Sequence, residues 1–96
     1  MIGVIATLKV REGKNDEFEA IFKELASKVR NEEAGNLAYQ LTKSRADPQT
    51  YKVLELYKDQ DALSAHGKTA YFRELGEKMG PCMAGRAEIE YLDAVQ

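Results

Sequence analysis

The chain has 96 residues, of which 44% are hydrophobic and 31% charged, and its formal net charge is −2 at pH 7. These values are typical of one soluble globular domain spanning residues 1–96, and they argue against a protein that binds nucleic acid or an anionic membrane surface. No apolar run approaches the roughly 20 residues of a transmembrane helix. The single cysteine, Cys82, fits a reducing compartment, so we expect a cytoplasmic protein.

The first part of the chain predicts a strand, a helix and a second strand. Residues 2–10 place apolar side chains at every second position, which is the period of a β-strand. Between residues 15 and 30 the apolar positions recur every three or four residues, as on one face of an amphipathic helix. They are Phe18, Ile21, Phe22, Leu25 and Val29. Asn15 or the residue before it is the expected N-cap, Gly35 ends the helical region, and residues 36–43 alternate again as a strand.

The second part predicts a third strand, a helical segment and a fourth strand. Residues 51–57 alternate, with Leu54 and Leu56 on one face of the strand and four other side chains on the opposite face. Those four are Tyr51, Val53, Glu55 and Tyr57. Residues 87–92 alternate in the same way and form the fourth predicted strand.

The helical segment between these two strands is predicted to be broken near its middle. An aspartate, Asp59 or Asp61, can cap a first short helix. Gly67 is predicted to end that helix in the left-handed conformation that glycine favours, and Thr69 can cap a second helix. The second helix must end before Pro81, because proline cannot donate the amide hydrogen bond that a helix needs.

The resulting order, β-α-β-β-α-β, is that of the ferredoxin-like α+β fold, in which two helices cover one face of a four-stranded antiparallel sheet. The other face is predicted to be too apolar for water, because Ile5, Tyr39, Val53 and Tyr57 or their neighbours must lie on it. A chain of this size cannot cover that face by itself. A second copy packed sheet to sheet is the simplest cover, so we expect a homodimer.

Four segments of the chain, taken in order, resemble the antibiotic biosynthesis monooxygenase family of dimeric α/β-barrel proteins. They are VREGK at residues 10–14, EAGNLAY at residues 33–39, ELYKDQDALSAH at residues 55–66 and TAYF at residues 69–72. The first is similar to the family's loop into the first helix, and the second to its Glu-Pro-Gly-Cys-x-x-Tyr segment. The third is similar to its Glu-x-Trp segment that ends in Ala-Leu-x-x-His, and the fourth to its Thr-x-His-Phe. The resemblance spans most of the chain and implies a dimeric barrel built from ferredoxin-like subunits.

The chain departs from the family pattern at several positions. Ala34 stands in place of the proline, Asn36 in place of the cysteine, and Tyr57 and Tyr71 in place of the tryptophan and the second histidine. The haem-degrading relatives use an asparagine on the first strand and a tryptophan; here that strand has Thr7 and the chain has no tryptophan, so haem degradation is not expected. Other members oxidise quinols, tailor aromatic polyketides or isomerise a signalling sugar phosphate.

The candidate catalytic residues are His66, the only histidine, and Glu55. A neutral imidazole can accept a phenolic proton, which is the first step in oxidising a quinol or an anthrone. A carboxylate among apolar neighbours needs a partner, and Glu55 could orient His66 as the third member of a triad does. The alternatives are structural: His66 satisfied by Glu55 or by a backbone carbonyl at a helix end, and Glu55 in a salt bridge with a lysine or arginine.

The candidate substrate-binding residues are aromatic. Tyr57, Tyr39, Phe72 and Phe22 could line a flat aromatic pocket between the helices and the sheet. Tyr71, at the position of the family's second histidine, is grouped with them. Aromatic residues at these spacings are equally the residues of an ordinary core, so this alternative stays open.

No cofactor and no metal are expected. One histidine and one cysteine cannot form a usual zinc site, and the chain has neither a GxGxxG motif nor a P-loop. An oxidation would then require the substrate anion itself to give an electron to O₂, which limits the substrates to electron-rich quinols and related phenols.

The sequence and the resemblance together predict a cofactor-independent monooxygenase that acts on quinols or related electron-rich aromatic compounds, with a small aromatic substrate and O₂ as its partners. Two alternatives remain. The first is a non-catalytic dimeric ligand-binding module, since one fold serves many functions. The second is an isomerase of a small phosphorylated ketone, for which Lys68, Arg73 and Arg86 would have to converge on the phosphate.

Overall fold

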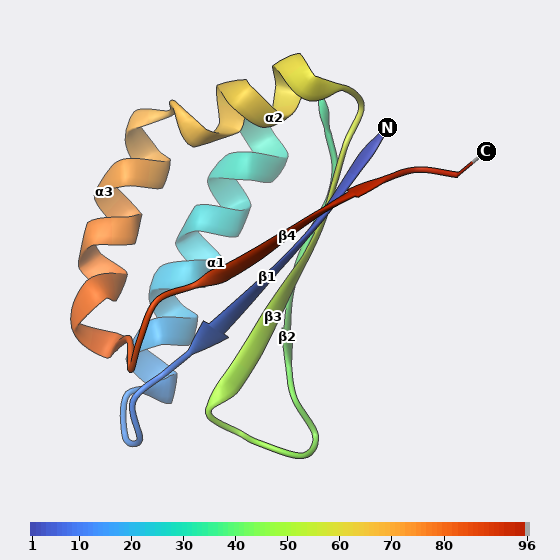
Figure 1. Cartoon of the computed structure of the whole chain (residues 1–96). Coiled ribbons are helices and arrows are strands. Elements are labelled where there is room, and N and C mark those ends of the chain that lie inside the picture. The colour runs from blue at the N-terminus through green and yellow to red at the C-terminus, as the bar shows by residue number, and fades with distance from the viewer. Residues whose placement is uncertain (96) are drawn as a thin grey trace.

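The computed structural model describes residues 1–95, which form a four-stranded sheet with three helices on one face (Figure 1). In chain order the elements are β1 (Ile2–Lys9), α1 (Asn15–Glu32), β2 (Asn36–Lys43), β3 (Thr50–Tyr57), α2 (Gln60–Gly67), α3 (Ala70–Met79), a 3₁₀ helix at Gly80–Cys82 and β4 (Glu88–Asp93). The strands lie in the order β2-β3-β1-β4, and each neighbouring pair is antiparallel. The predicted ferredoxin-like α+β fold is therefore confirmed.

Helix α1 is amphipathic, and its apolar stripe packs towards the sheet. The stripe consists of the buried residues Phe18, Phe22, Leu25, Ala26 and Val29. The helix begins at Asn15 as predicted and runs to Glu32, two residues beyond the predicted end. The Asn15 side chain does not cap it: the amide donates instead to the carbonyl of Pro48 (3.0 Å) and to the hydroxyl of Tyr51 (2.9 Å), which ties the start of the helix to β3. Within residues 1–95 no helix is long and apolar enough to cross a membrane.

Side chains at the two predicted caps start α2 and α3. The Asp59 carboxylate accepts a hydrogen bond from the amide of Ala62 at 2.9 Å, which fixes the first turn of α2. The Thr69 hydroxyl accepts one from the amide of Phe72 at 3.3 Å and fixes the first turn of α3. These caps orient α2, and with it the histidine near its end, against the rest of the helical layer.

The prediction that Gly67 takes a left-handed conformation is wrong. Gly67 is the last residue of α2, and among residues 1–95 only Gly13 has a positive φ, of 85°. The chain continues through Lys68 in a right-handed conformation and then through Thr69, whose extended backbone turns it into α3. The break therefore comes from an extended cap residue and needs no glycine-specific geometry.

The helices cover the face of the sheet that carries the large side chains of β3. Tyr51, Val53 and Tyr57 are almost completely buried there, beside Tyr39 of β2. The expectation that Tyr39, Val53 and Tyr57 lie on the uncovered face is wrong, since Val53 pairs with Ala6 of β1, another buried residue of the covered face. Alternation determines which side chains share a face, but not which face the helices cover.

The uncovered face of the sheet carries an apolar patch, which we call the open-face patch. It consists of Ile5, Leu54, Leu56 and Leu92. The three leucines are 37–44% exposed, and they lie on adjacent strands, since Ile5 pairs with Leu54 and Gly3 pairs with both Leu56 and Leu92. An apolar area that crosses three strands marks a surface suited to a partner.

Candidate functional site

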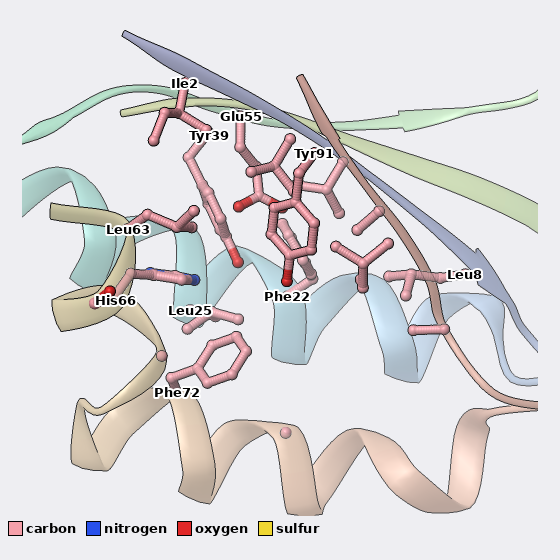
Figure 2. Close-up of a pocket in the computed structure, with 18 of the residues that line it drawn as sticks. Ile2, Leu8, Phe22, Leu25, Tyr39, Glu55, Leu63, His66, Phe72 and Tyr91 are labelled. Atoms are coloured by element: carbon pink, nitrogen blue, oxygen red, sulfur yellow. The ribbon is translucent and has the colours of Figure 1, made fainter. Parts of the chain in front are cut away.

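A cavity of about 800 Å³ lies between the helical layer and the covered face of the sheet. Its wall is mostly apolar, with Phe22 and Leu25 from α1, Phe72 from α3, Ile2 from β1 and Tyr91 from β4 (Figure 2). Among residues 1–95 no lysine or arginine lines it. A cavity of this size and character suits an uncharged or weakly polar organic molecule.

His66 lies near the end of α2 and is 5% exposed. Three aromatic rings surround its imidazole: Tyr39, Tyr57 and Phe72, with ring centroids at 5.3, 5.5 and 4.7 Å. Figure 2 shows a ring nitrogen directed into the cavity. This atom is Nε2, because the other ring nitrogen, Nδ1, contacts Glu33. Within residues 1–95 Nε2 has no hydrogen-bond partner of its own. His66 therefore offers the cavity one unpartnered nitrogen.

Glu33, just beyond the end of α1, is the partner of His66 that the sequence analysis missed. Its two carboxylate oxygens each lie 3.0 Å from Nδ1 of His66, and the Tyr71 hydroxyl donates to the same carboxylate. Burial and this hydrogen bond to Glu33 raise the pKa of Tyr71 to about 12, so Tyr71 remains a donor at neutral pH. The three side chains form one hydrogen-bonded group, of which only His66 lines the cavity.

Gly35 is the sequence signal that could have indicated this contact. A Cβ atom at this position would lie 2.6 Å from the Cβ of Ala62 in α2, closer than side chains approach one another. The loop that follows α1 therefore packs directly against α2 only because residue 35 is glycine. This close approach brings Glu33 to His66.

Glu55 lies on β3, and its side chain lines the cavity (Figure 2). It does not hydrogen-bond to His66; its carboxylate accepts a hydrogen bond from the Tyr57 hydroxyl at 2.7 Å. Burial raises the pKa of Glu55 above its ordinary value, against the smaller opposing effects of the Tyr57 hydrogen bond and the charge of His66. Burial and the contact with Glu55 also raise the pKa of Tyr57. Glu55 thus presents to the cavity a carboxyl group that holds a proton more tightly than an exposed glutamate does.

Tyr39 contributes a second unpartnered polar group to the cavity. Its ring stacks on Phe22, with centroids 5.5 Å apart and an interplanar angle of 9°. Within residues 1–95 its hydroxyl has no hydrogen-bond partner. Burial, followed by the negative charges of Glu55 and Glu33, raises the pKa of Tyr39, so the hydroxyl stays protonated and can donate to a ligand.

The structure thus brings most of the predicted site residues to one cavity. Those that line it are His66, Glu55, Tyr39, Phe72 and Phe22. Tyr57 and Tyr71 do not line it: Tyr57 is fully buried and donates to the Glu55 carboxylate, and Tyr71 donates to the Glu33 carboxylate. Both hold a carboxylate in place.

Cys82 lies outside this site. Its side chain is buried and donates to a carboxylate oxygen of Glu17 at 2.9 Å. Burial and this carboxylate raise the pKa of the thiol, which is the behaviour of an unreactive cysteine. Within residues 1–95, the His, Cys, Asp and Glu side chains form no group of three or more that could hold a metal ion.

Comparisons with known proteins identify a family. The family model described as antibiotic biosynthesis monooxygenase matches residues 1–78. The Bacillus subtilis (strain 168) protein named Putative monooxygenase YcnE is 36% identical over 73 residues, which cover 76% of this chain and 76% of that protein. An uncharacterised protein from Synechocystis sp. is 29% identical over 89 residues, which cover 93% of this chain but only 60% of that longer protein. The crystal structure of a putative antibiotic biosynthesis monooxygenase from Caulobacter crescentus CB15 has a TM-score of 0.97 and 57% identity, and the match covers 99% of this chain and 90% of that one.

Proposed function

Because the chain belongs to the antibiotic biosynthesis monooxygenase family, we propose that it oxidises quinols or related electron-rich phenols with O₂, without a metal or flavin. The observation that supports this best is that two polar groups without protein partners among residues 1–95, Nε2 of His66 and the hydroxyl of Tyr39, face one apolar cavity. A base and a hydrogen-bond donor in an apolar space suit a flat phenol, which has a proton to give and an oxygen to be held.

The first step is transfer of the phenolic proton to Nε2 of His66. The substrate O–H bond breaks and an N–H bond forms, which leaves an imidazolium next to Glu33 and a phenolate in the cavity. Tyr39 donates a hydrogen bond to the phenolate oxygen, because its raised pKa keeps its hydroxyl protonated. The apolar side chains of the wall lower the local polarity and so strengthen this hydrogen bond.

The second step is oxidation of the phenolate. It transfers one electron to O₂, and the resulting semiquinone radical and superoxide combine to a ring peroxide, which takes the proton back from His66. The C–H bond at the same ring carbon and the O–O bond then break together: one oxygen stays on that carbon as a carbonyl, and the other leaves as water with the hydrogen that the carbon lost. For a hydroquinone the products are a hydroxyquinone and water, and the substrate supplies all four electrons that O₂ accepts.

The cavity wall argues against an isomerase of a phosphorylated ketone. Such an enzyme needs cationic ligands for the phosphate. Lys68, Arg73 and Arg86 do not line the cavity, and the carboxyl group of Glu55 does. A non-catalytic binding module would use the same cavity, so only an assay of turnover separates it from an oxygenase.

Oxygen uptake with a panel of quinols of one, two and three rings tests the proposal. We expect one O₂ to be consumed per quinol, one labelled oxygen atom to enter the product from ¹⁸O₂, and the rate to be unchanged by a chelator. Equal turnover under nitrogen would contradict an oxygenase, and a rate abolished by the chelator would contradict chemistry without a metal. Quinol binding without oxygen uptake would favour the binding module.

We also infer that the chain forms a homodimer through the open-face patch. Leu54, Leu56 and Leu92 are 37–44% exposed on the side of the sheet that the helices leave uncovered. A second copy would bury these side chains by the same surface in both subunits, as a twofold interface requires.

A further inference from the structure

The carboxylate of Glu33 contacts His66 from behind the cavity wall. Both of its oxygens lie 3.0 Å from Nδ1, whereas Glu33 is not among the residues that line the cavity, so it does not contact a bound substrate. We propose that Glu33 is a positioning residue: it keeps the imidazole proton on Nδ1, leaves Nε2 free to accept the substrate's proton, and balances the charge while His66 holds that proton. The inference rests on the proposed function for the role of Nε2.

The hydrogen bonds around Glu33 determine which nitrogen carries the proton. An ionised carboxylate only accepts hydrogen bonds, and the Tyr71 hydroxyl already donates to it. Nδ1 of His66 is the second group in contact, so it must donate as well. A neutral imidazole has one N–H, and Nε2 is then left with a free lone pair.

The rings packed around His66 hold the imidazole in this orientation. Tyr39, Tyr57 and Phe72 approach it with centroids at 4.7–5.5 Å. If the ring turned by half a revolution, a carbon would replace Nδ1 opposite Glu33, and the buried carboxylate would lose a donor. The Glu33 side chain is only 11% exposed, so water cannot fully replace that donor.

Glu33 also supplies the charge that the first step requires. Proton transfer turns His66 into a cation inside a largely apolar site, which is unfavourable unless an opposite charge lies close by. The Glu33 carboxylate is already in hydrogen-bond contact with the ring, so this stabilisation needs no movement. The proton stays on His66 until the peroxide takes it back, and none passes to Glu33.

A second hollow gives access to Glu33 from the other side. It measures about 590 Å³, it is lined by Glu33, Tyr71 and Gly35 among others, and it shares no lining residue with the substrate cavity. If Glu33 is shortened to alanine, a small carboxylate such as formate can reach the vacated place while the substrate cavity is filled. Rescue by formate therefore tests the position of the charge.

The first test is nitrogen NMR of ¹⁵N-histidine-labelled protein, in which His66 is the only histidine. In the neutral ring we expect the hydrogen on Nδ1 and the signal of an unprotonated nitrogen at Nε2. Glu33→Ala should lose this preference, whereas Glu32→Ala, its neighbour at the end of α1, should keep it. A hydrogen on Nε2 in the parent protein would overturn the proposal, whether or not the variants fold.

The second test is kinetic. Glu33→Ala and Glu33→Gln should lower kcat at least about tenfold, within the roughly 10²- to 10⁴-fold loss expected for removal of the base itself, and leave KM little changed. Formate should restore part of the activity of Glu33→Ala but not that of a His66→Ala variant. Glu32→Ala should behave like the parent. Parent-like kcat in both Glu33 variants would contradict the proposal.

The two tests separate this inference from the proposed function. If no quinol is oxidised, but the hydrogen lies on Nδ1 and depends on Glu33, the proposed oxidation fails and the positioning role stands. If quinols are oxidised, but Glu33→Ala matches Glu32→Ala in tautomer and kcat, the oxidation stands and the positioning role fails.

Discussion

Glu55 is the cavity residue whose ionisation conflicts most with its surroundings. Within residues 1–95 its carboxylate accepts a side-chain hydrogen bond only from Tyr57. Burial, the largest influence, raises its pKa above the ordinary value of 4.5. The folded protein thus binds a proton at Glu55 more tightly than the unfolded chain does. The stabilising effect of that proton is complete below 4.5 and is lost as the pH rises through the raised pKa.

Replacing Glu55 by glutamine should therefore stabilise the protein at neutral pH. The amide has no charge to bury, and its carbonyl can still accept the hydrogen bond from Tyr57. Denaturant titrations should give Glu55→Gln the larger free energy of unfolding at pH 7–8, and the difference should disappear as the pH falls below 4.5. Glu24→Gln, on the exposed face of α1, is the matched control and should show no such pH dependence. A parent protein more stable than Glu55→Gln at neutral pH would contradict the argument.

Single residues of the site could be predicted from the sequence where their type alone carried the information. His66 is the only histidine, and Glu55 alternates with apolar residues on a predicted strand, so both were accessible as candidates. The pairing of His66 with Glu33 could not be predicted. Glu33 lies 33 positions from His66, and no periodicity connects a loop after one helix with the end of another. Only the packing of α2 against that loop brings them together.

At the level of elements, the contact between α2 and the loop after α1 depends on one glycine. Gly35→Ala should be destabilising by about 1–3 kcal/mol, because the new Cβ would overlap the Cβ of Ala62 and push the loop away from α2. Gly67→Ala is the matched control: apart from its chain neighbours and the backbone of its own helix, no atom lies within 4 Å of its Cβ position, and its φ is not positive. It should leave stability unchanged or raise it by up to about 1 kcal/mol.

Thermal or denaturant unfolding of both glycine variants checks this expectation. Because Gly35 sets the position of Glu33, the Gly35→Ala variant should also disturb the His66 tautomer signal, whereas Gly67→Ala should not. Equal stability of the two variants would show that the loop can move away without cost, and the account of how Glu33 reaches His66 would then fail.

The bounds of the elements follow closely from side-chain periodicity, and their junctions do not. Strand β2 spans Asn36–Lys43, as alternation predicted, because alternation continues until the chain turns. The end of α2 was predicted wrongly, since glycine after a helix often marks a left-handed C-cap. Here Gly67 remains helical, and the extended Thr69 ends the helix instead.

At the level of the whole molecule, the sequence predicts the ferredoxin-like fold but not which face of the sheet the helices cover. Val53 and Tyr57 were placed on the wrong face, because both faces of β3 are apolar and alternation cannot distinguish them. The corrected assignment changes the expected interface. The proposed interface is then the open-face patch, which includes Leu54 and Leu56, whereas Val53 belongs to the core.

Leu54→Asp should convert the proposed homodimer into a folded monomer. The new carboxylate would be buried without a partner in the dimer, at a cost of several kcal/mol, about 2–5, but it would lie in water in the monomer. Leu37→Asp is the control, because Leu37 is 52% exposed at the bulge in β2 and outside the open-face patch. Sedimentation equilibrium at micromolar concentration should give twice the chain mass for the parent and Leu37→Asp, and the single mass for Leu54→Asp. A monomeric parent, or a dimeric Leu54→Asp, would contradict the interface.

Oxygen uptake by His66→Ala with the best quinol of the panel decides whether His66 is the base. If Nε2 of His66 takes the phenolic proton, the rate should fall by about 10²- to 10⁴-fold while the variant keeps the fold and the oligomeric state of the parent. Added imidazole should restore part of the rate, because it can enter the space that the side chain leaves in the cavity wall. A folded His66→Ala protein that oxidises the quinol at the parent rate would show that His66 is not the base.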